Sequence, residues 1–170
     1  KLLKKIFQNL MLENKISNGI IYLQITRGVQ SREHAYKKNL KPNVVVYTVK
    51  KKFNLPNKNY KGFKAITYPD IRWGRPDIKT TSILANIIAA TEASKKGAYE
   101  TILVKGKKIT EASHSNVWIV KGNKIITHPA NKEILKGVTR TVLINIIYSL
   151  GLKLTEKEFS LKELYESDEV

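Results

Sequence analysis

The sequence predicts a mixed α/β or α+β fold, and three features of its 170 residues support that class. Stretches rich in β-branched and aromatic residues alternate with stretches that carry the apolar periodicity of amphipathic helices. Two pairs of strand-like stretches each enclose a Gly-containing turn, as β-hairpins do. With 42% hydrophobic residues, the chain can bury a substantial core. A charged stretch with Pro and Asn at 54–61 predicts a linker between domain 1–53 and a hairpin-rich domain 62–170.

The first domain is predicted to contain one helix and two strands. Residues 1–13 form an amphipathic helix, and its apolar face consists of Leu2, Leu3, Ile6, Phe7, Leu10 and Met11. The stretches 20–26 and 44–50 are β-branched and aromatic, which predicts two strands, paired antiparallel. A long polar loop joins them, and loops of that length in compact domains are often functional.

The second domain is predicted to start with an extended stretch at 64–73 and a helix over 80–96. A hydroxyl residue can cap the start of this helix, the candidates being Thr80, Thr81 and Ser82. The buried stripe of the helix is predicted to contain Ile83, Leu84, Ile87, Ile88 and Ala90.

Hairpins are predicted next, at 99–112 and 116–129, each about a Gly-containing turn. A further helix follows over 138–151 and ends at Gly151. Its predicted inward residues are Val142, Leu143, Ile146, Ile147 and Leu150. Near the end of the chain, Ser160 and Glu163 have the spacing of a capping box, which predicts another helix start.

The net charge of +17 has two interpretations. Clustered Lys and Arg neutralise phosphates, so a basic nucleic-acid-binding protein is one of them. The other is a Lys-rich solvated surface. The lysines are scattered and no nucleic-acid-binding motif occurs, which favours the second interpretation and predicts no nucleic-acid partner.

Other compositional features exclude certain kinds of site and of protein. The absence of cysteine excludes disulfides and thiolate metal sites. Three histidines are too few to favour a structural zinc site, so no metal is predicted. No apolar run is long enough to span a bilayer and no signal-peptide pattern occurs, so we predict a cytoplasmic protein without a membrane partner.

Two features suggest covalent chemistry. Lys79 stands between an extended stretch and an apolar helical stretch, where its amine would point into the structure. A sheltered lysine amine can form a Schiff base with an aldehyde, whereas the ordinary alternative is a surface lysine. Glu111 lies among small hydroxyl residues, and a carboxylate there can pair with a protonated ring nitrogen. The ordinary alternative for Glu111 is an exposed loop between hairpins.

Two further features suggest anion binding. Gly137 allows close approach of the backbone, and Val138 and Thr139 follow it at the first turn of a helix, whose free N–H groups suit a phosphate. Arg32 and His34 alternate in the long loop, so both can face one side and hold a carboxylate. An ordinary turn and a solvated loop are the alternatives.

Together these residues supply an amine, a partner for a ring nitrogen, a phosphate site and a carboxylate clamp. Those are the parts that an enzyme using pyridoxal phosphate on amino acids requires. The sequence also resembles the class IV (fold-type IV) pyridoxal phosphate-dependent aminotransferases along its whole length. The resemblance rests on "IYLQITRGVQSREH", "DIRWGRPDIKT", "TEASHSNVW" and "THPANKEILKGVTR". The pair Arg32 and His34 points to the D-amino-acid branch, while Trp118 stands where the family usually has Phe or Tyr.

The resemblance implies a role for each candidate residue. Lys79 would bind the cofactor as a Schiff base and then carry the α-proton of the substrate. Glu111 would pair with the pyridine nitrogen. Val138 and Thr139, following Gly137, would bind the phosphate through backbone N–H groups.

The remaining roles concern the ring and the substrate. Leu135 would pack on one face of the ring, and Arg72 would lie near the cofactor. Arg32 and His34 would hold the substrate carboxylate, in the active site of a partner in a homodimer.

The resemblance further implies a small α/β domain and a larger pseudo-barrel domain, both partial, because intact members have more chain on each side. The implied reaction is transamination between a D-amino acid such as D-alanine and a 2-oxo acid such as 2-oxoglutarate. Four alternatives stay open: a branched-chain L-amino-acid aminotransferase, an aminodeoxychorismate lyase, an inactive remnant, and a basic nucleic-acid-binding protein.

Overall fold

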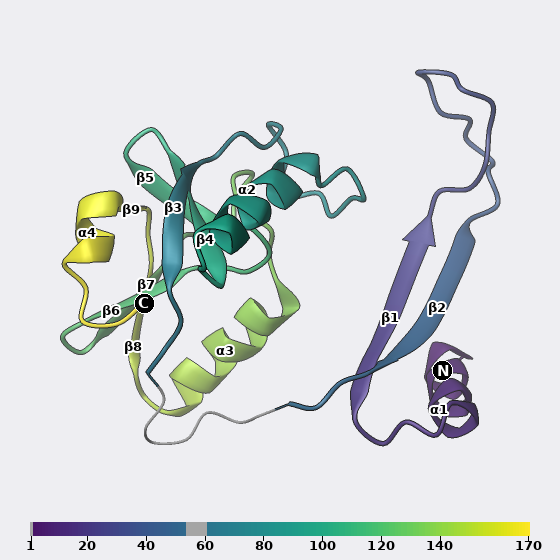
Figure 1. The fold of residues 1–170 in the computed structure, drawn as a ribbon, viewed down its shortest axis with the longest axis horizontal. Coiled ribbons are helices and arrows are strands. Elements are labelled where there is room, and N and C mark those ends of the chain that lie inside the picture. The colour runs from purple at the N-terminus through teal and green to yellow at the C-terminus, as the bar shows by residue number, and fades with distance from the viewer. Residues whose placement is uncertain (1, 54–60) are drawn as a thin grey trace. The chain divides into compact units, whose positions relative to one another are not determined.

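The computed structural model describes residues 2–53 and 61–170, in two compact units, Lys1–Tyr60 and Lys61–Val170 (Figure 1). Almost all of the predicted linker, 54–61, lies outside the described residues, so the predicted domain boundaries stay a prediction. Helices and strands mix in both halves of the chain, as the sequence predicts.

Unit 1 contains the predicted helix and strand pair: α1 (Leu2–Glu13), β1 (Gly19–Thr26) and β2 (Asn43–Lys50). The two strands pair antiparallel along their full length. Tyr22 faces Tyr47 across the ladder, and their rings stack with centroids 4.8 Å apart. Aromatic pairs of this kind stabilise neighbouring strands.

The long loop between β1 and β2 is held by contacts of its own. The Gln30 side chain donates to the Ala35 carbonyl at 3.1 Å and accepts from the Lys37 backbone N–H at 2.9 Å. The Arg27 guanidinium lies 3.7 Å from the centre of the Tyr36 ring, a cation–π contact. These contacts give the loop a defined path without burying it.

Unit 2 contains two sheets. The first has the strand order β3-β4-β5-β9, and its strands are β3 (Ala65–Pro69), β4 (Glu100–Lys105), β5 (Lys108–Ala112) and β9 (Phe159–Ser160). The second has the order β6-β7-β8, with β6 (Trp118–Lys121), β7 (Lys124–Thr127) and β8 (Lys153–Glu156). The two predicted hairpins, β4–β5 and β6–β7, are confirmed.

Helices connect the parallel pairs of these sheets. The crossover between β3 and β4 contains α2 (Leu84–Lys95), and the one between β7 and β8 contains α3 (Val138–Ser149). In Figure 1, α2 lies against β4, and α3 packs on β8. A short helix, α4 (Leu161–Tyr165), follows β9 with the predicted capping box: the Ser160 hydroxyl accepts from the Glu163 N–H, and the Glu163 carboxylate accepts from the Ser160 N–H.

The core of unit 2 is apolar and draws on both hairpins and on α4. Its buried members are Ile102, Ile109, Ala112, Val117, Ile119, Ile126, Phe159 and Leu164. They come from segments that are far apart in the sequence, so the core joins the two sheets. The strand β5, which carries Glu111, contributes Ile109 and Ala112 to this core.

The start of α2 differs from the prediction. The helix begins at Leu84 rather than at residue 80, and Ile83 occupies the N-cap position without a side-chain cap. The Thr80 hydroxyl instead accepts a hydrogen bond from the Ser82 N–H at 3.3 Å. Thr80 therefore supports a local turn ahead of the helix, a use of hydroxyl side chains that competes with helix capping.

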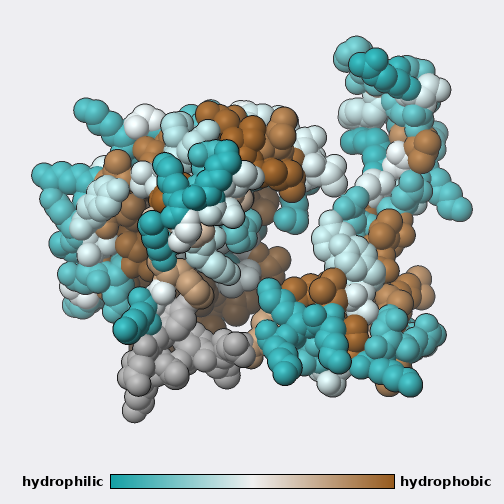
Figure 2. Space-filling model, in the orientation of Figure 1, coloured by the Kyte–Doolittle hydropathy of each residue, from teal (hydrophilic) through white to brown (hydrophobic). Residues whose placement is uncertain are grey.

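The predicted buried stripes of α2 and α3 are also wrong in most positions. In α2 the buried residues are Ala89 and Ala93, whereas Leu84 is 70% exposed. In α3, Ile147 is buried but Leu150 is 66% exposed. Small residues let α2 approach β3 and β4 closely, which turns its larger apolar residues outward. Figure 2 shows apolar side chains gathered over α2.

Candidate active site

A cavity of about 1080 Å³ in unit 2 gathers the predicted cofactor residues. It is bounded by the β3–α2 connection, the end of β5, the segment after it, and the first turns of α2 and α3. The predicted residues that line it are Arg72, Lys79, Glu111, Leu135, Gly137, Val138 and Thr139. Candidate residues that are up to 67 positions apart in the sequence therefore line one cavity.

Glu111 lies in β5 and forms a buried ion pair with Arg72. Its side chain is 7% exposed and that of Arg72 is 5% exposed. Arg72 Nη1 donates to Glu111 Oε1. On its other side, Arg72 donates to Asp70 through Nε at 2.9 Å and through Nη2 at 2.7 Å. Arg72 thus bridges two buried carboxylates.

The two carboxylates differ in the direction of their pKa shifts. Burial raises the pKa of Glu111, and the hydrogen bond and charge of Arg72 offset this only in part. Burial acts on Asp70 in the same direction, but hydrogen bonds from Arg72 and Thr110 outweigh it and lower the pKa of Asp70. Asp70 is therefore the firmer partner of Arg72, and Glu111 is the carboxylate whose charge is less well compensated.

Asn116 and Leu135 hold Glu111 from the other side. Asn116 Nδ2 donates to Glu111 Oε2 at 2.9 Å and to the Leu135 carbonyl at 2.9 Å. The Leu135 N–H donates to both carboxylate oxygens of Glu111, at 3.1 Å each. These bonds fix the orientation of the carboxylate and join it to the segment that leads into α3.

Gly137 is needed for packing at this point. A Cβ atom at Gly137 would lie 2.6 Å from Asn116 Oδ1, closer than real contacts allow. The sequence predicts that Gly137 permits close approach to a ligand; the structure shows close approach to Asn116. The glycine therefore lets the segment before α3 lie against the group that holds Glu111.

The N-terminus of α3 opens on the cavity. Gly137 is the N-cap, and the first backbone bond of the helix runs from the Thr141 N–H to the Gly137 carbonyl at 3.1 Å. The N–H groups of Val138 and Thr139 precede this bond and have no acceptor within the helix. Val138 is 82% exposed. Such N–H groups, with the positive end of the helix dipole, suit a phosphate.

Lys79 lines the same cavity, but its surroundings differ from the prediction. Its side chain is exposed, and residues 80–83 separate it from the start of α2. The expected shelter from an adjoining helix is therefore absent in the described part of the chain. Its role as the amine that anchors a cofactor stays a prediction.

Arg32 and His34 lie in the β1–β2 loop of unit 1, and both are exposed. The lining of the cavity comes from unit 2. Their role in holding a substrate carboxylate stays a prediction.

Sequence reasoning missed two residues of the site. Asp70 binds Arg72, and the alternation of positions 70 and 72 at the end of an extended stretch is a signal that could have revealed it. Asn116 belongs to a motif quoted above but has no predicted role. Its contact with Leu135 spans 19 positions in the sequence, so no local pattern indicates it.

Comparison with known proteins identifies the family of the chain. A family model described as "Amino-transferase class IV" matches residues 1–170. The chain belongs to the class IV aminotransferases. The predicted family and the predicted fold-type IV class are therefore confirmed.

Individual relatives extend the comparison. The D-alanine aminotransferase of Listeria monocytogenes is 38% identical over 170 residues, which are 99% of this chain and 59% of that protein. This chain thus spans 59% of the length of that curated relative. The branched-chain amino acid aminotransferase of Escherichia coli has a TM-score of 0.80 at 21% identity, covering 98% of this chain and 57% of its own.

A third comparison concerns a cofactor-bound structure. A hypothetical aminotransferase from Mycobacterium tuberculosis, in a PLP-bound form, has a TM-score of 0.73 at 22% identity. It covers 95% of this chain and 58% of its own. At this identity the likeness shows the fold of class IV members. Within residues 2–53 and 61–170, no helix has the length and apolar character needed to cross a membrane.

Proposed function

We propose that the protein binds pyridoxal 5'-phosphate in the unit 2 cavity and transfers amino groups between a D-amino acid such as D-alanine and a 2-oxo acid such as 2-oxoglutarate. The observation that carries this proposal is that Lys79, the buried carboxylate of Glu111 and the N-terminus of α3 line one cavity. Membership of the class IV aminotransferases supports it. A cytoplasmic location is part of the proposal.

The charge around Glu111 suits a pyridinium nitrogen. Asp70 and Glu111 bring two negative charges when both are ionised, and Arg72 brings one positive charge. One negative charge is then left over on the carboxylate that lines the cavity. A protonated ring nitrogen placed against Glu111 would neutralise it, which would offset the burial that now raises the pKa of Glu111.

The phosphate of the proposed cofactor would bind at the N-terminus of α3. The N–H groups of Val138 and Thr139 can donate to phosphate oxygens, and the helix dipole favours the negative charge. Because Asn116 joins Glu111 to the Leu135 carbonyl, the nitrogen end and the phosphate end of the site are connected by hydrogen bonds. The residues present therefore fit the cofactor.

Lys79 would supply the amine that binds the aldehyde carbon and, once displaced by the substrate, would accept the proton from the substrate Cα. When bound, the cofactor supplies a ring that stabilises the negative charge left at that carbon. Glu111 would hold the ring nitrogen in its protonated form. Leu135, which lines the cavity, would limit the movement of the ring.

The D-amino-acid preference rests on the Arg32 and His34 pair and on the D-alanine aminotransferase relatives at 38% identity. An Arg can hold a carboxylate through two hydrogen bonds, and a His can add a third. We include a homodimer in the proposal, in which the β1–β2 loop of one copy would serve the site of its partner. The loop's own contacts give it a defined path, which supports this part of the proposal.

The proposal is tested by incubating the purified protein with pyridoxal phosphate, 2-oxoglutarate and either D-alanine or L-leucine. We expect pyruvate from D-alanine, its loss in Lys79→Ala, and its retention in Lys153→Ala, an exposed lysine of β8. Turnover of L-leucine without turnover of D-alanine would replace the D-amino-acid assignment by the branched-chain alternative. No turnover of either amino acid by the folded protein would contradict transamination by this chain.

A further inference from the structure

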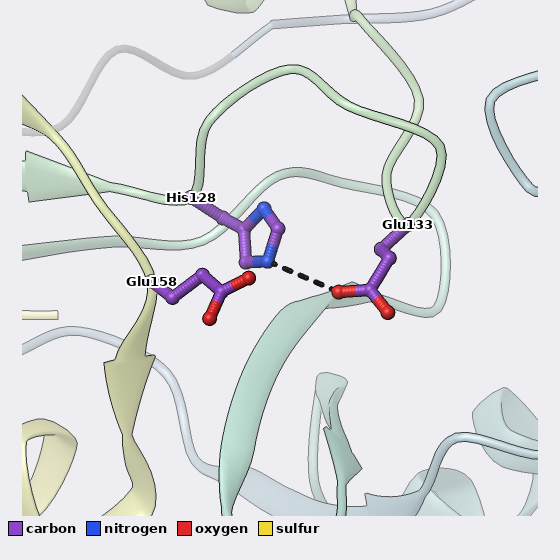
Figure 3. Close-up of side chains that lie close together, drawn as sticks. All are labelled: His128, Glu133 and Glu158. Atoms are coloured by element: carbon purple, nitrogen blue, oxygen red, sulfur yellow. Dashed lines mark ion pairs between the residues drawn. The ribbon is translucent and has the colours of Figure 1, made fainter.

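Three ligand-type side chains meet on the side of unit 2 shown in Figure 3, outside the lining of the cavity described above. His128 follows β7, Glu133 lies between β7 and α3, and Glu158 directly precedes β9. One nitrogen or oxygen atom from each lies within 4.8 Å of the others. Both carboxylates point towards the imidazole ring (Figure 3).

The burial of His128 and the tautomer of its ring are the first argument that this cluster binds a cation. The residue is 1% exposed. Its Nδ1 lies 2.9 Å from the Pro129 carbonyl, and because a carbonyl can only accept, Nδ1 carries the proton. In the neutral ring, Nε2 then bears a lone pair. A histidine whose other nitrogen donates to a backbone carbonyl is the usual arrangement of a metal ligand.

The surroundings of Nε2 are the second argument. Among the described residues, this buried atom has no hydrogen-bond partner. Its neighbour is Glu133 Oε2 at 3.8 Å, which is beyond hydrogen-bond distance. A buried polar atom without a partner is costly. A cation between the nitrogen lone pair and the carboxylate oxygens would remove that cost.

The carboxylates keep capacity for such a cation. Lys105 binds Glu133 Oε1 at 2.9 Å, and Lys108 binds Glu158 Oε2. One oxygen of each carboxylate is left for another ligand. Both lysine side chains are 58% exposed, so they pair with the outer side of the cluster while His128 closes its inner side.

We propose that His128, Glu133 and Glu158 bind a divalent transition-metal ion such as Zn²⁺, with water completing its coordination. Zinc accepts histidine nitrogen and carboxylate oxygen at about 2.0–2.2 Å, so ligand atoms around it lie roughly 3–3.5 Å apart. A separation of 3.8 Å between His128 and Glu133 requires only a small side-chain adjustment. The composition, with no cysteine and three histidines, predicts no metal, and this proposal departs from that prediction.

The ion would stabilise a segment that borders the cavity. It would join the segment before β9 to the segment between β7 and α3. The Glu133 carbonyl accepts from Arg72 Nη2 at 3.2 Å, and two positions further the Leu135 N–H donates to Glu111. Metal binding would therefore stabilise the segment that holds Glu111, whether or not the protein transfers amino groups.

The inference is tested by adding Zn²⁺ alone to the untagged chain. Calorimetric titration measures binding, and thermal melting measures stability. We expect one bound ion per chain and a higher melting temperature, because a ligand of the folded state stabilises it. Glu158→Gln and Glu133→Gln should each weaken binding about 10-fold or more. The matched control is Glu166→Gln, an exposed carboxylate paired with Lys162 elsewhere on the surface.

Two results would overturn the inference. One is a folded chain that shows no saturable zinc binding. The other is binding that both Glu158→Gln and Glu133→Gln leave unchanged, which would place the ion elsewhere, for example at the His114–Glu100 pair. Circular dichroism of each variant tests whether it folds, and because the Glu158 side chain is 36% exposed, its substitution is not expected to disturb the core.

Discussion

Arg72 and Glu111 form an ion pair across 39 sequence positions, and both side chains are almost completely buried. Because Asp70 binds the other side of the same guanidinium, Arg72 holds two carboxylates together at the wall of the cavity. The hydrogen bond and charge of Arg72 offset part of the burial that raises the pKa of Glu111.

Arg72→Ala is expected to be strongly destabilising. Removing one partner of a buried ion pair leaves uncompensated charge, which typically costs about 3–5 kcal/mol. Here the carboxylates of both Asp70 and Glu111 would lose their charged partner. Urea denaturation measures the effect, and Arg75→Ala is the matched control because its pair with Asp77 is at the surface. Equal stability losses in the two variants would contradict the importance of the buried pair.

Gly137→Ala is expected to act through Asn116. The added Cβ would lie 2.6 Å from Asn116 Oδ1, so the contact must open, and overpacking of this kind costs about 1–3 kcal/mol. The double variant with Asn116→Ala should lose less stability than the sum of the two single variants. Strict additivity, measured by thermal unfolding of all four proteins, would show that the two residues do not interact in this way.

The capping box of α4 gives a prediction about pH. Hydrogen bonds from Lys157 and from the Ser160 backbone lower the pKa of Glu163 from 4.5 to about 2. Because the lowered pKa belongs to the folded state, the contribution of Glu163 is fully present above pH 4.5 and is lost as the pH falls towards 2. In Glu163→Gln the acid dependence of stability should be shallower between these values, while Glu166→Gln should resemble the parent. Identical acid profiles for all three proteins would refute the assignment.

The observed burial of Ile109 and exposure of Leu84 predict different losses of stability when each side chain is truncated. Ile109 is fully buried, whereas Leu84 is 70% exposed. Ile109→Ala is therefore expected to cost about 2–5 kcal/mol, and Leu84→Ala clearly less. Guanidinium denaturation of the two variants compares them. A larger loss for Leu84→Ala would mean that the face of α2 is covered in solution.

Local features of the fold could be predicted because their causes lie within a few residues. The capping box needs Ser160 and Glu163 alone, and the hairpin turns need Gly106 and Gly122, which have φ angles of 63° and 57°. The buried faces of α2 and α3 could not be predicted in this way, because burial depends on which side meets a sheet formed by distant segments.

The same distinction applies to the candidate site. Lys79, Glu111 and Gly137 stand in recognisable motifs, so sequence reasoning selected them, and all three line the cavity. The contacts that position Glu111 come from Arg72, Asn116 and Leu135, and two of these cross 39 and 24 sequence positions. Spacing within a motif does not contain that information.

The proposal that Lys79 anchors pyridoxal phosphate in the unit 2 cavity can be tested by locating the covalent adduct. The protein is incubated with the cofactor, reduced with borohydride and digested, and mass spectrometry identifies the modified peptide. We expect one phosphopyridoxyl group, on Lys79, and its loss in Lys79→Ala. A group found instead on Lys136, which lines the same cavity, or an undiminished yield in Lys79→Ala, would contradict it.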